Sequence, residues 1–177
     1  MDNSFIKYKI STLENWCGLK YKQVLYDSDV DNKSSEIFRN KIINHSHLYF
    51  IVIDSEDNVF GHYHNKMIDE IGYDMNDDDI FLFILNSNGR SSADNFKRKK
   101  NVCTHIYDKG FYYCGHIGYD TGYYSVVDIG TANSRVHEDL SHFFYIDEPE
   151  IFTGSCYSFG YDNFYKVERI IVIEMNE

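Results

Sequence analysis

Apolar residues in the chain are grouped in short runs that predict β-strands. Residues 48–53 (LYFIVI) and 80–85 (IFLFIL) are apolar at successive positions, which is typical of strands that are covered on both faces. The run VFGHYH at 59–64 follows the polar turn SEDN, so residues 48–64 are expected to form a β-hairpin with a four-residue loop. The closing stretch KVERIIVIEM at 166–175 is also apolar enough to be expected inside a sheet.

Other segments predict further strands and two helices. The Gly-punctuated, Tyr-rich residues 111–129 and the run FFYI at 143–146 are expected to be strands. The stretch STLENWCGLK predicts a short helix capped by Ser11 or Thr12, and SSEIFRNKIINH predicts a second helix capped by one of its two opening serines. Together these patterns predict an α+β fold that is mostly antiparallel β.

The composition is that of one ordered, acidic domain. With 177 residues, 17% aromatic residues and one proline, the chain is long enough and apolar enough for a full core. Its net charge of −11 disfavours nucleic acids and anionic membranes as partners. No apolar run approaches the roughly 20 residues of a membrane-spanning helix. The opening MDNSFIKYKI has no signal-peptide pattern, so we expect a soluble cytoplasmic protein.

The four cysteines show no C-x-x-C spacing and are expected to be unpaired thiols in the cytosol. They are Cys17, Cys103, Cys114 and Cys156. Cys103 has the nearest basic neighbours in sequence, and we expect none of the four to be a low-pKa nucleophile.

His62 and His64 raise the question of a metal site. Period-two alternation places both imidazoles on one face of a strand, and two imidazoles at this spacing can bind one metal ion. A working site needs a third ligand, and the nearest acids, Asp69 and Glu70, lie in a segment without predicted structure. The main interpretation is a half-solvated face of an edge strand with no metal. A metal-dependent hydrolase that uses the two histidines is an alternative.

An acidic loop precedes the second predicted helix. Asp27, Asp29 and Asp31 match the first ligand positions of a calcium-binding loop. The match then ends, because Asn32 replaces the glycine of the sharp turn and Phe38 replaces the bidentate Glu. We therefore expect the loop to place negative charge near the helix N-terminus without binding calcium.

Two further charged runs are candidate binding surfaces. Asp77, Asp78 and Asp79 precede the strand at 80–85, and in an acidic protein they form a candidate surface for a basic protein partner. The run KRKK at 97–100 is the one basic run in the chain. It could contact phosphates while nearby Tyr residues stack on bases, which makes a nucleic-acid-binding regulator a second alternative.

The chain contains no recognisable catalytic constellation. GSCYSFG resembles a nucleophile elbow, but Cys156 stands where the motif requires Gly before Ser158. No Gly-rich phosphate-binding loop is present. Neither a catalytic residue nor a cofactor is predicted.

Several motifs occur in the order that is found in the TLDc domain. LENWCGLKYKQVLYDSDVDNKSSEIFRNKI resembles the opening of that domain, and LYFIVIDSEDNVFGHY resembles its strand–turn–strand that ends in Phe-Gly-Gly-Tyr. DDDIFLFIL resembles its Ser-Phe-Leu-Phe-Ser-Leu strand, and FTGSCYSFGYDNFYKVERIIVIEM resembles its closing segment. The residues at motif positions are Tyr26, Asp27, Asp31, Phe60, Gly61, Tyr63, Phe81, Phe83 and Glu174. His62 departs from the pattern at the second Gly, Asn32 at a usual Gly, and Met175 at a common Trp.

The resemblance covers about residues 13–175 and is closest to short, Asn-rich members from amoebic parasites. It implies an N-terminal lead at 1–12 and a single TLDc-like domain at 13–177, built as a β-sandwich of two antiparallel sheets flanked by a few helices. It also implies a non-enzymatic protein-interaction module that has no cofactor. The implied links are to oxidative-stress resistance and to the vacuolar proton-pumping ATPase, a subunit of which is the expected partner. The resemblance does not indicate an oligomeric state.

Overall fold

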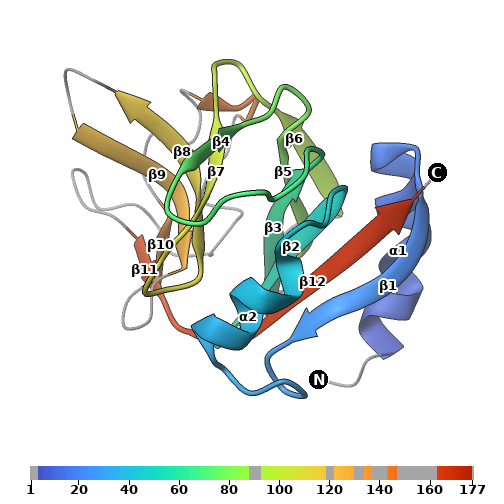
Figure 1. Cartoon of the computed structure of the whole chain (residues 1–177). Helices are drawn as coiled ribbons and strands as arrows, with labels where there is room; N and C mark the ends of the chain where they lie inside the picture. The colour runs from blue at the N-terminus through green and yellow to red at the C-terminus, as the bar shows by residue number, and fades with distance from the viewer. Residues whose placement is uncertain are drawn as a thin grey trace.

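Two six-stranded antiparallel sheets make up most of the molecule (Figure 1). The computed structural model describes residues 4–87, 93–118, 122–129, 134–136, 143–146 and 163–176. The first sheet contains β1 (Lys20–Asp27), β2 (Leu48–Asp54), β3 (Asn58–His64), β5 (Phe81–Ser87), β6 (Asp94–Lys97) and β12 (Val167–Asn176). The second contains β4 (Asp74–Asn76), β7 (Cys103–Ile106), β8 (Tyr112–Gly118), β9 (Gly122–Ile129), β10 (Ser134–Val136) and β11 (Asn163–Tyr165). The helices are α1 (Ser4–Cys17) and α2 (Ser35–Ile42).

The strand order explains which runs of the sequence are most apolar. The first sheet has the order β1-β12-β2-β3-β5-β6, and the second has the order β11-β10-β9-β8-β7-β4. The strands that contain IFLFIL and ERIIVIEM, β5 and β12, therefore each lie between two neighbours. Both were expected inside a sheet, and both predictions are confirmed, as is the antiparallel α+β sandwich with few helices.

Two separate apolar layers bury the first sheet on both faces. One layer lies between the sheets and contains Phe50 and Phe60 of the first sheet with Tyr112 of the second. The other lies between the first sheet and α1, where Leu13 packs with Tyr49 and the Tyr49 hydroxyl donates to the Leu13 carbonyl at 2.8 Å. This double coverage is why the central strands are apolar at successive positions.

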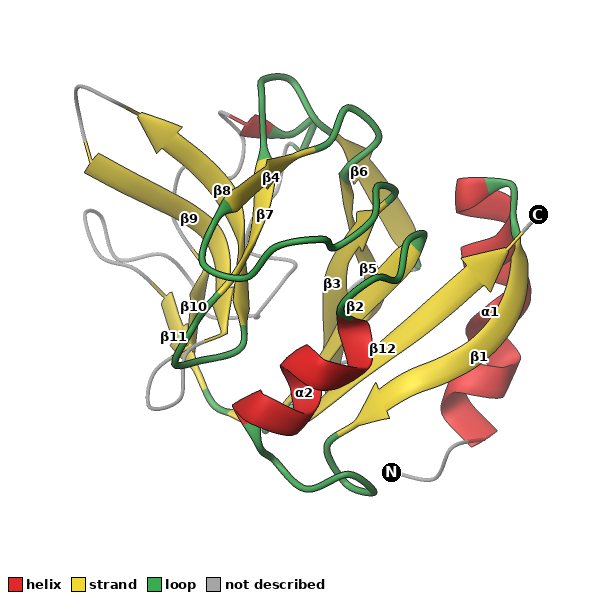
Figure 2. Cartoon of the chain, in the orientation of Figure 1, coloured by secondary structure: helices red, strands yellow, loops and turns green. Residues whose placement is uncertain are grey.

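The helix α2 closes one end of the sandwich, as Figure 2 shows. Its Phe38 ring lies 5.2 Å from the ring of Tyr26, 6.3 Å from Phe50 and 5.9 Å from Tyr112, so it contacts residues of both sheets. Ser34 caps the helix by accepting a hydrogen bond from the Ile37 amide, in agreement with the predicted start.

The hairpin expected at residues 48–64 is present as β2 and β3, with Leu48 paired to His64 and Ile53 to Val59. The connection holds three residues rather than the expected four, because Asn58 already belongs to β3. Asp54 fixes this turn by accepting hydrogen bonds at 2.9 Å from the Asn58 amide and at 2.7 Å from its side chain.

Two local expectations were wrong. Ser11 and Thr12 do not cap the first helix, which begins at Ser4 and runs across the proposed boundary between residues 12 and 13. The contacts of α1 with the first sheet come from Ile10 onwards, through Ile10, Leu13 and Trp16. The run FFYI at 143–146 forms only an isolated bridge between Arg98 and Phe144, with Tyr145 exposed and the other three residues buried.

Gly61 is required by the close approach of β2 and β3. A Cβ atom at this position would overlap the backbone carbonyl of Phe50, and rotation of a side chain cannot relieve that overlap. We expect Gly61→Ala to lower the free energy of unfolding by roughly 2–4 kcal/mol in urea denaturation.

Gly18→Ala is the matched control for this change. Gly18 has a positive φ of 78° but nothing within 4 Å of an added Cβ, so only backbone strain of about 1 kcal/mol is expected. Equal losses of stability in the two variants would contradict the proposed steric role of Gly61.

Candidate functional site

The two histidines of β3 lie in the interior of the sandwich. His62 and His64 are both fully buried, because β3 is an interior strand and the second sheet covers the face that carries His62. The expectation of a half-solvated face on an edge strand is therefore wrong. The period-two pattern correctly placed both side chains on one face, but it did not show how many strands follow β3.

His62 connects the two sheets. Its ring stacks on Phe50 at 4.7 Å between centroids, and its Nε2 atom lies 3.0 Å from the Thr104 hydroxyl on β7. Burial lowers the pKa of His62 well below 6.5, and the nearby His64 lowers it further. His62 is therefore a neutral ring that packs between the sheets.

His64 lies beside a buried carboxylate. Its Nδ1 atom is 3.5 Å from the Asp77 Oδ2 atom, and neither ring nitrogen has a hydrogen-bond partner. Burial lowers the pKa of His64 to about 4, although the charge of Asp77 acts in the opposite direction. Burial has the larger effect because the whole imidazole is shielded from water.

The arrangement around this pair does not provide a set of metal ligands. Within the described ranges, no three His, Cys, Asp or Glu side chains are grouped so that they could hold a metal ion. His62 and His64 are also closed off from solvent, whereas a catalytic metal keeps a position open for water or substrate.

The acids of the calcium-like loop hold the loop to neighbouring elements. Asp27 is 4% exposed and forms a two-pronged ion pair with Arg169 of β12, at 2.8 Å and 2.5 Å. Asp31 accepts a hydrogen bond from the Asp27 amide at 3.0 Å and pairs with Lys41 of α2 at 2.7 Å. These carboxylates therefore link β1, β12 and α2.

The three acids at 77–79 do not form one surface, contrary to expectation. Asp77 is buried and accepts hydrogen bonds from the backbone amides of Asn65 at 2.5 Å and of Lys66 at 3.3 Å. Asp78 and Asp79 are exposed. Asp77 therefore stabilises the chain after β3, and only its two neighbours can contact a partner.

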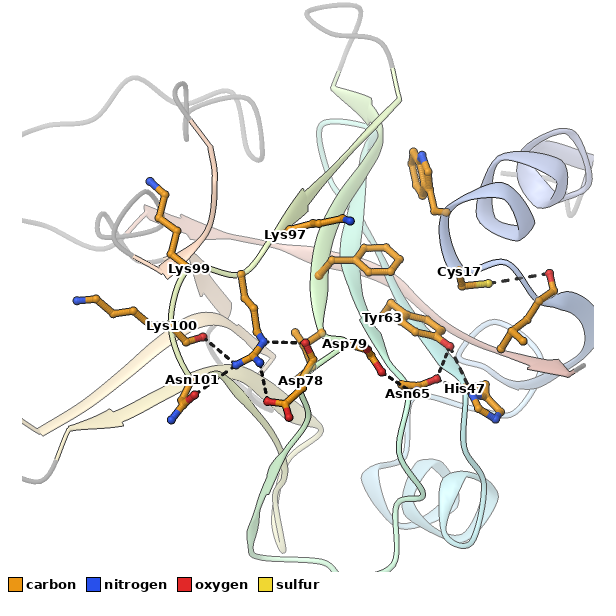
Figure 3. A pocket seen from close by; sticks show the side chains of 15 residues that line it. Cys17, His47, Tyr63, Asn65, Asp78, Asp79, Lys97, Lys99, Lys100 and Asn101 are labelled. Carbon is orange, nitrogen blue, oxygen red and sulfur yellow. Dashed lines mark hydrogen bonds and ion pairs between the residues drawn. The ribbon is translucent and has the colours of Figure 1, made fainter.

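The exposed acids and the basic run line one open groove of about 810 Å³ (Figure 3). The groove lies over the ends of β3, β5 and β6, beside the last turn of α1. Antiparallel pairing brings the two charged runs together, because Phe81 at the start of β5 is paired with Lys97 at the end of β6. Both runs are visible in the sequence. Their pairing could not be predicted, because β6 is short and polar and has no apolar pattern typical of a strand.

Arg98 joins the two charged runs. Its guanidinium lies 2.5 Å from the Asp78 carboxylate and 2.7 Å from the Asp78 carbonyl, and it also donates to the Asn101 side chain at 3.3 Å. On the other side of the groove, Asp79 accepts a hydrogen bond from Asn65 at 3.0 Å. These contacts hold the wall of the groove in one geometry.

Most residues at the TLDc-like motif positions belong to the core. Their side chains pack between the sheets or beneath α1, as for Tyr26, Phe60, Tyr63, Phe81 and Phe83. Glu174 is a polar exception, and its carboxylate accepts hydrogen bonds from Gln23 at 2.8 Å and His45 at 2.9 Å. Burial raises its pKa, but these hydrogen bonds and that of Lys22 outweigh burial and lower it overall.

A polar cluster on the second sheet was not found in the sequence. Asp74 on β4 accepts hydrogen bonds from the Tyr113 hydroxyl at 2.6 Å and from His105 at 2.8 Å, and the His105 and Tyr113 rings stack at 4.9 Å. Its members are far apart in sequence and form no motif. The cluster joins β4, β7 and β8.

The described cysteines are free thiols. Cys103 and Cys114 are buried, and burial raises the pKa of Cys103 to about 12 and that of Cys114 well above its usual value. Cys17 is half-buried at the edge of the groove. Cys156 lies outside the described residues.

Comparisons with known proteins identify no relative. No protein-family model matches the chain, and a search of curated proteins finds no significant match. The resemblance to the TLDc domain is not tested by these comparisons and stays a hypothesis. Within the described part of the chain, neither helix has the length and apolar character needed to cross a membrane.

The buried histidines predict a loss of stability in mild acid. The pKa of His64 is about 4 in the folded protein and about 6.5 when exposed, so between these values only the unfolded chain binds the proton. The free energy of unfolding is therefore expected to fall as the pH is lowered from 6.5 towards 4. At pH 5 the loss from His64 alone is on the order of 2 kcal/mol.

Urea denaturation between about pH 7 and pH 5 measures this slope for wild type and for His64→Gln. The variant removes the titrating ring and should show a clearly shallower slope, whatever its absolute stability. Identical slopes in both proteins would show that His64 is not the source of the pH dependence.

Burial also predicts the order in which thiols react. In a Cys156→Ser background, we expect N-ethylmaleimide to modify Cys17 before Cys103 and Cys114, because the latter two are buried and held as thiols. Peptide mapping by mass spectrometry after short labelling at neutral pH measures the order. Rapid modification of Cys103 alone would instead indicate a redox-sensing thiol.

Proposed function

We propose that this protein is a non-enzymatic, cytoplasmic protein-interaction module of the TLDc type, and that its partner binds at the groove bounded by Asp78, Asp79 and residues 97–100. The observation that carries the proposal is the groove itself. It gathers exposed charges of both signs on a rigid framework of three strand ends and one helix end.

The chemistry of the groove favours binding over catalysis. Arg98 is held by Asp78, and Asp79 is hydrogen-bonded to Asn65. The buried imidazoles of His62 and His64 lie within the protein and not among the residues that line the groove. A general acid or base needs to reach the substrate, and this pair does not. The imidazole that does line the groove, His47, is held by the Asn65 side chain at 2.7 Å.

The partner follows from the TLDc resemblance. We propose a subunit of the vacuolar proton-pumping ATPase as the first partner to test, with a role in resistance to oxidative stress. The fold supports the proposal insofar as the motif residues Phe60, Gly61 and Phe83 occupy buried positions of a two-sheet sandwich, as the resemblance implies.

Charge reversal at the groove is expected to change partner binding and leave the fold intact. The variant is Asp78→Lys/Asp79→Lys, since both side chains are exposed and exposed ion pairs contribute roughly 0–1 kcal/mol. Asp77 is left unchanged, because removing its buried carboxylate would leave the amides of Asn65 and Lys66 without an acceptor.

Tagged wild type is used to capture the ATPase from detergent-solubilised vacuolar membranes, with its subunits quantified by mass spectrometry. We expect recovery to change about tenfold or more in the double variant, because it alters the charge of the groove and removes the contacts of Asp78 with Arg98 and of Asp79 with Asn65. The control is Asp69→Lys/Glu70→Lys, which changes two exposed adjacent acids that do not line the groove. If the pump is not captured by wild type, or is captured equally by all three proteins, the proposal is wrong.

A further inference from the structure

We propose that the groove binds an acidic peptide segment that carries an aromatic or large apolar side chain. This inference rests on the proposed interaction function and defines the kind of segment that the partner presents. It reverses the expectation from the whole chain, whose net charge of −11 favours a basic partner.

The first argument is the local charge of the groove. Among the residues that the structure describes, the lining has four cations and two carboxylates. The cations are Lys97, Arg98, Lys99 and Lys100, and the carboxylates are those of Asp78 and Asp79. The Asp78 carboxylate is already paired with Arg98. The groove is therefore a positive site on a strongly negative protein, and a carboxylate in a bound peptide would find complementary charge there.

The second argument is the position of Lys97. Figure 3 shows its side chain extending across the groove towards α1, whereas the side chains of Lys99 and Lys100 extend to the opposite side. Lys97 is exposed, and no described carboxylate lies within ion-pair distance of its amine. Lys99 and Lys100 lie over the rings of Tyr145 and Phe143, at 5.1 Å and 5.8 Å. Lys97 is thus the cation best placed to meet an acid inside the groove.

The third argument is the apolar part of the lining. Trp16 on α1 is half-buried and faces the Phe83 ring at 6.0 Å, and Tyr63 and Phe81 also line the groove with their rings stacked at 5.0 Å. A volume of about 810 Å³ is sufficient for several side chains of a peptide. Tyr63 and Phe81 are 3% and 8% exposed and form the floor of the groove. The half-buried Trp16 ring, near Lys97, is therefore the apolar surface that a segment with acids flanking one aromatic residue would contact.

The whole-molecule charge favours a short acidic peptide over a nucleic acid. A nucleic acid carries a negative charge at every phosphate beyond the groove, where the rest of this acidic protein repels it. A peptide can place two or three carboxylates at the basic wall and leave the remainder neutral. Its binding should weaken with salt, because the contacts are exposed ion pairs.

Binding is tested with a synthetic peptide in which two Glu residues stand on each side of a central Phe, labelled at its N-terminus. Fluorescence anisotropy measures affinity for the full chain. The same peptide with Lys in place of Glu, and a labelled single-stranded oligothymidine, are the comparison probes. We expect saturable binding of the Glu peptide, and at least about fivefold weaker binding of both comparison probes.

The location of binding is tested with one matched pair of variants. Lys97→Glu should weaken the Glu peptide by at least about fivefold, since it replaces attraction with repulsion. Lys109→Glu makes the same change in net charge at an exposed residue that does not line the groove, and should bind as wild type does. Trp16 is the only tryptophan of the chain, so unlabelled peptide should also change the intrinsic fluorescence of wild type.

Each other outcome overturns the inference. Tighter binding of oligothymidine would assign the groove to nucleic acid, and tighter binding of the Lys peptide would assign it to basic segments. Absence of saturable binding to any probe, or equal affinity of the Lys97→Glu and Lys109→Glu variants, would remove the groove as an acidic-peptide site. Capture of the ATPase in the separate experiment would then still support the interaction function.

Discussion

Burial of the first sheet on both faces is the constraint on which most of the structure depends. The second sheet covers one face and α1 covers the other, so side chains that alternate along β2 enter two different apolar layers. Phe50 packs towards the second sheet, and Tyr49 packs towards Leu13 of the helix. The same constraint accounts for the glycine in β3, because neither face of that strand offers space in which the backbone of β2 could move away.

Two of the polar side chains in this interior, His62 and Asp77, form hydrogen bonds with neighbouring segments. His62 is neutral, stacked and hydrogen-bonded across to Thr104, and so it fixes the relative position of the sheets as well as filling space. Asp77 is tied to backbone amides at the end of β3. Unpaired buried polar atoms are destabilising, so the two unpartnered ring nitrogens of His64 lower the stability of this part of the core.

The elements that could be predicted from the sequence are those marked by signals within their own residues. The hairpin at 48–64, the strand IFLFIL and the helix capped by Ser34 follow from apolar runs, turn residues and a cap. The start of α1 could not be predicted in this way, because Ser11 and Thr12 are residue types that favour a helix cap, yet they lie inside a helix that begins at Ser4.

The candidate site was only half predictable. Asp77 and Asp78 are identical neighbours, and only contacts with Asn65 and Arg98 make one a buried anchor and the other a surface acid. The sequence identified both charged runs but interpreted them as independent surfaces. Their meeting in one groove depends on the pairing of β5 with β6, a strand of four residues with no apolar alternation.

The placement of β12 has a consequence for the order of folding. It lies between β1 and β2, so Tyr49 pairs with Ile173 and Val24 also pairs with Ile173 from the other side. The two flanking strands leave the ribosome early, yet the strand that joins them is made only after the whole second sheet has been synthesised. Until then the edges of β1 and β2 that pair with β12 have no partner, and β2 is apolar at all but its last position. Folding is therefore expected to be slow in its last step, with the incomplete chain vulnerable to aggregation.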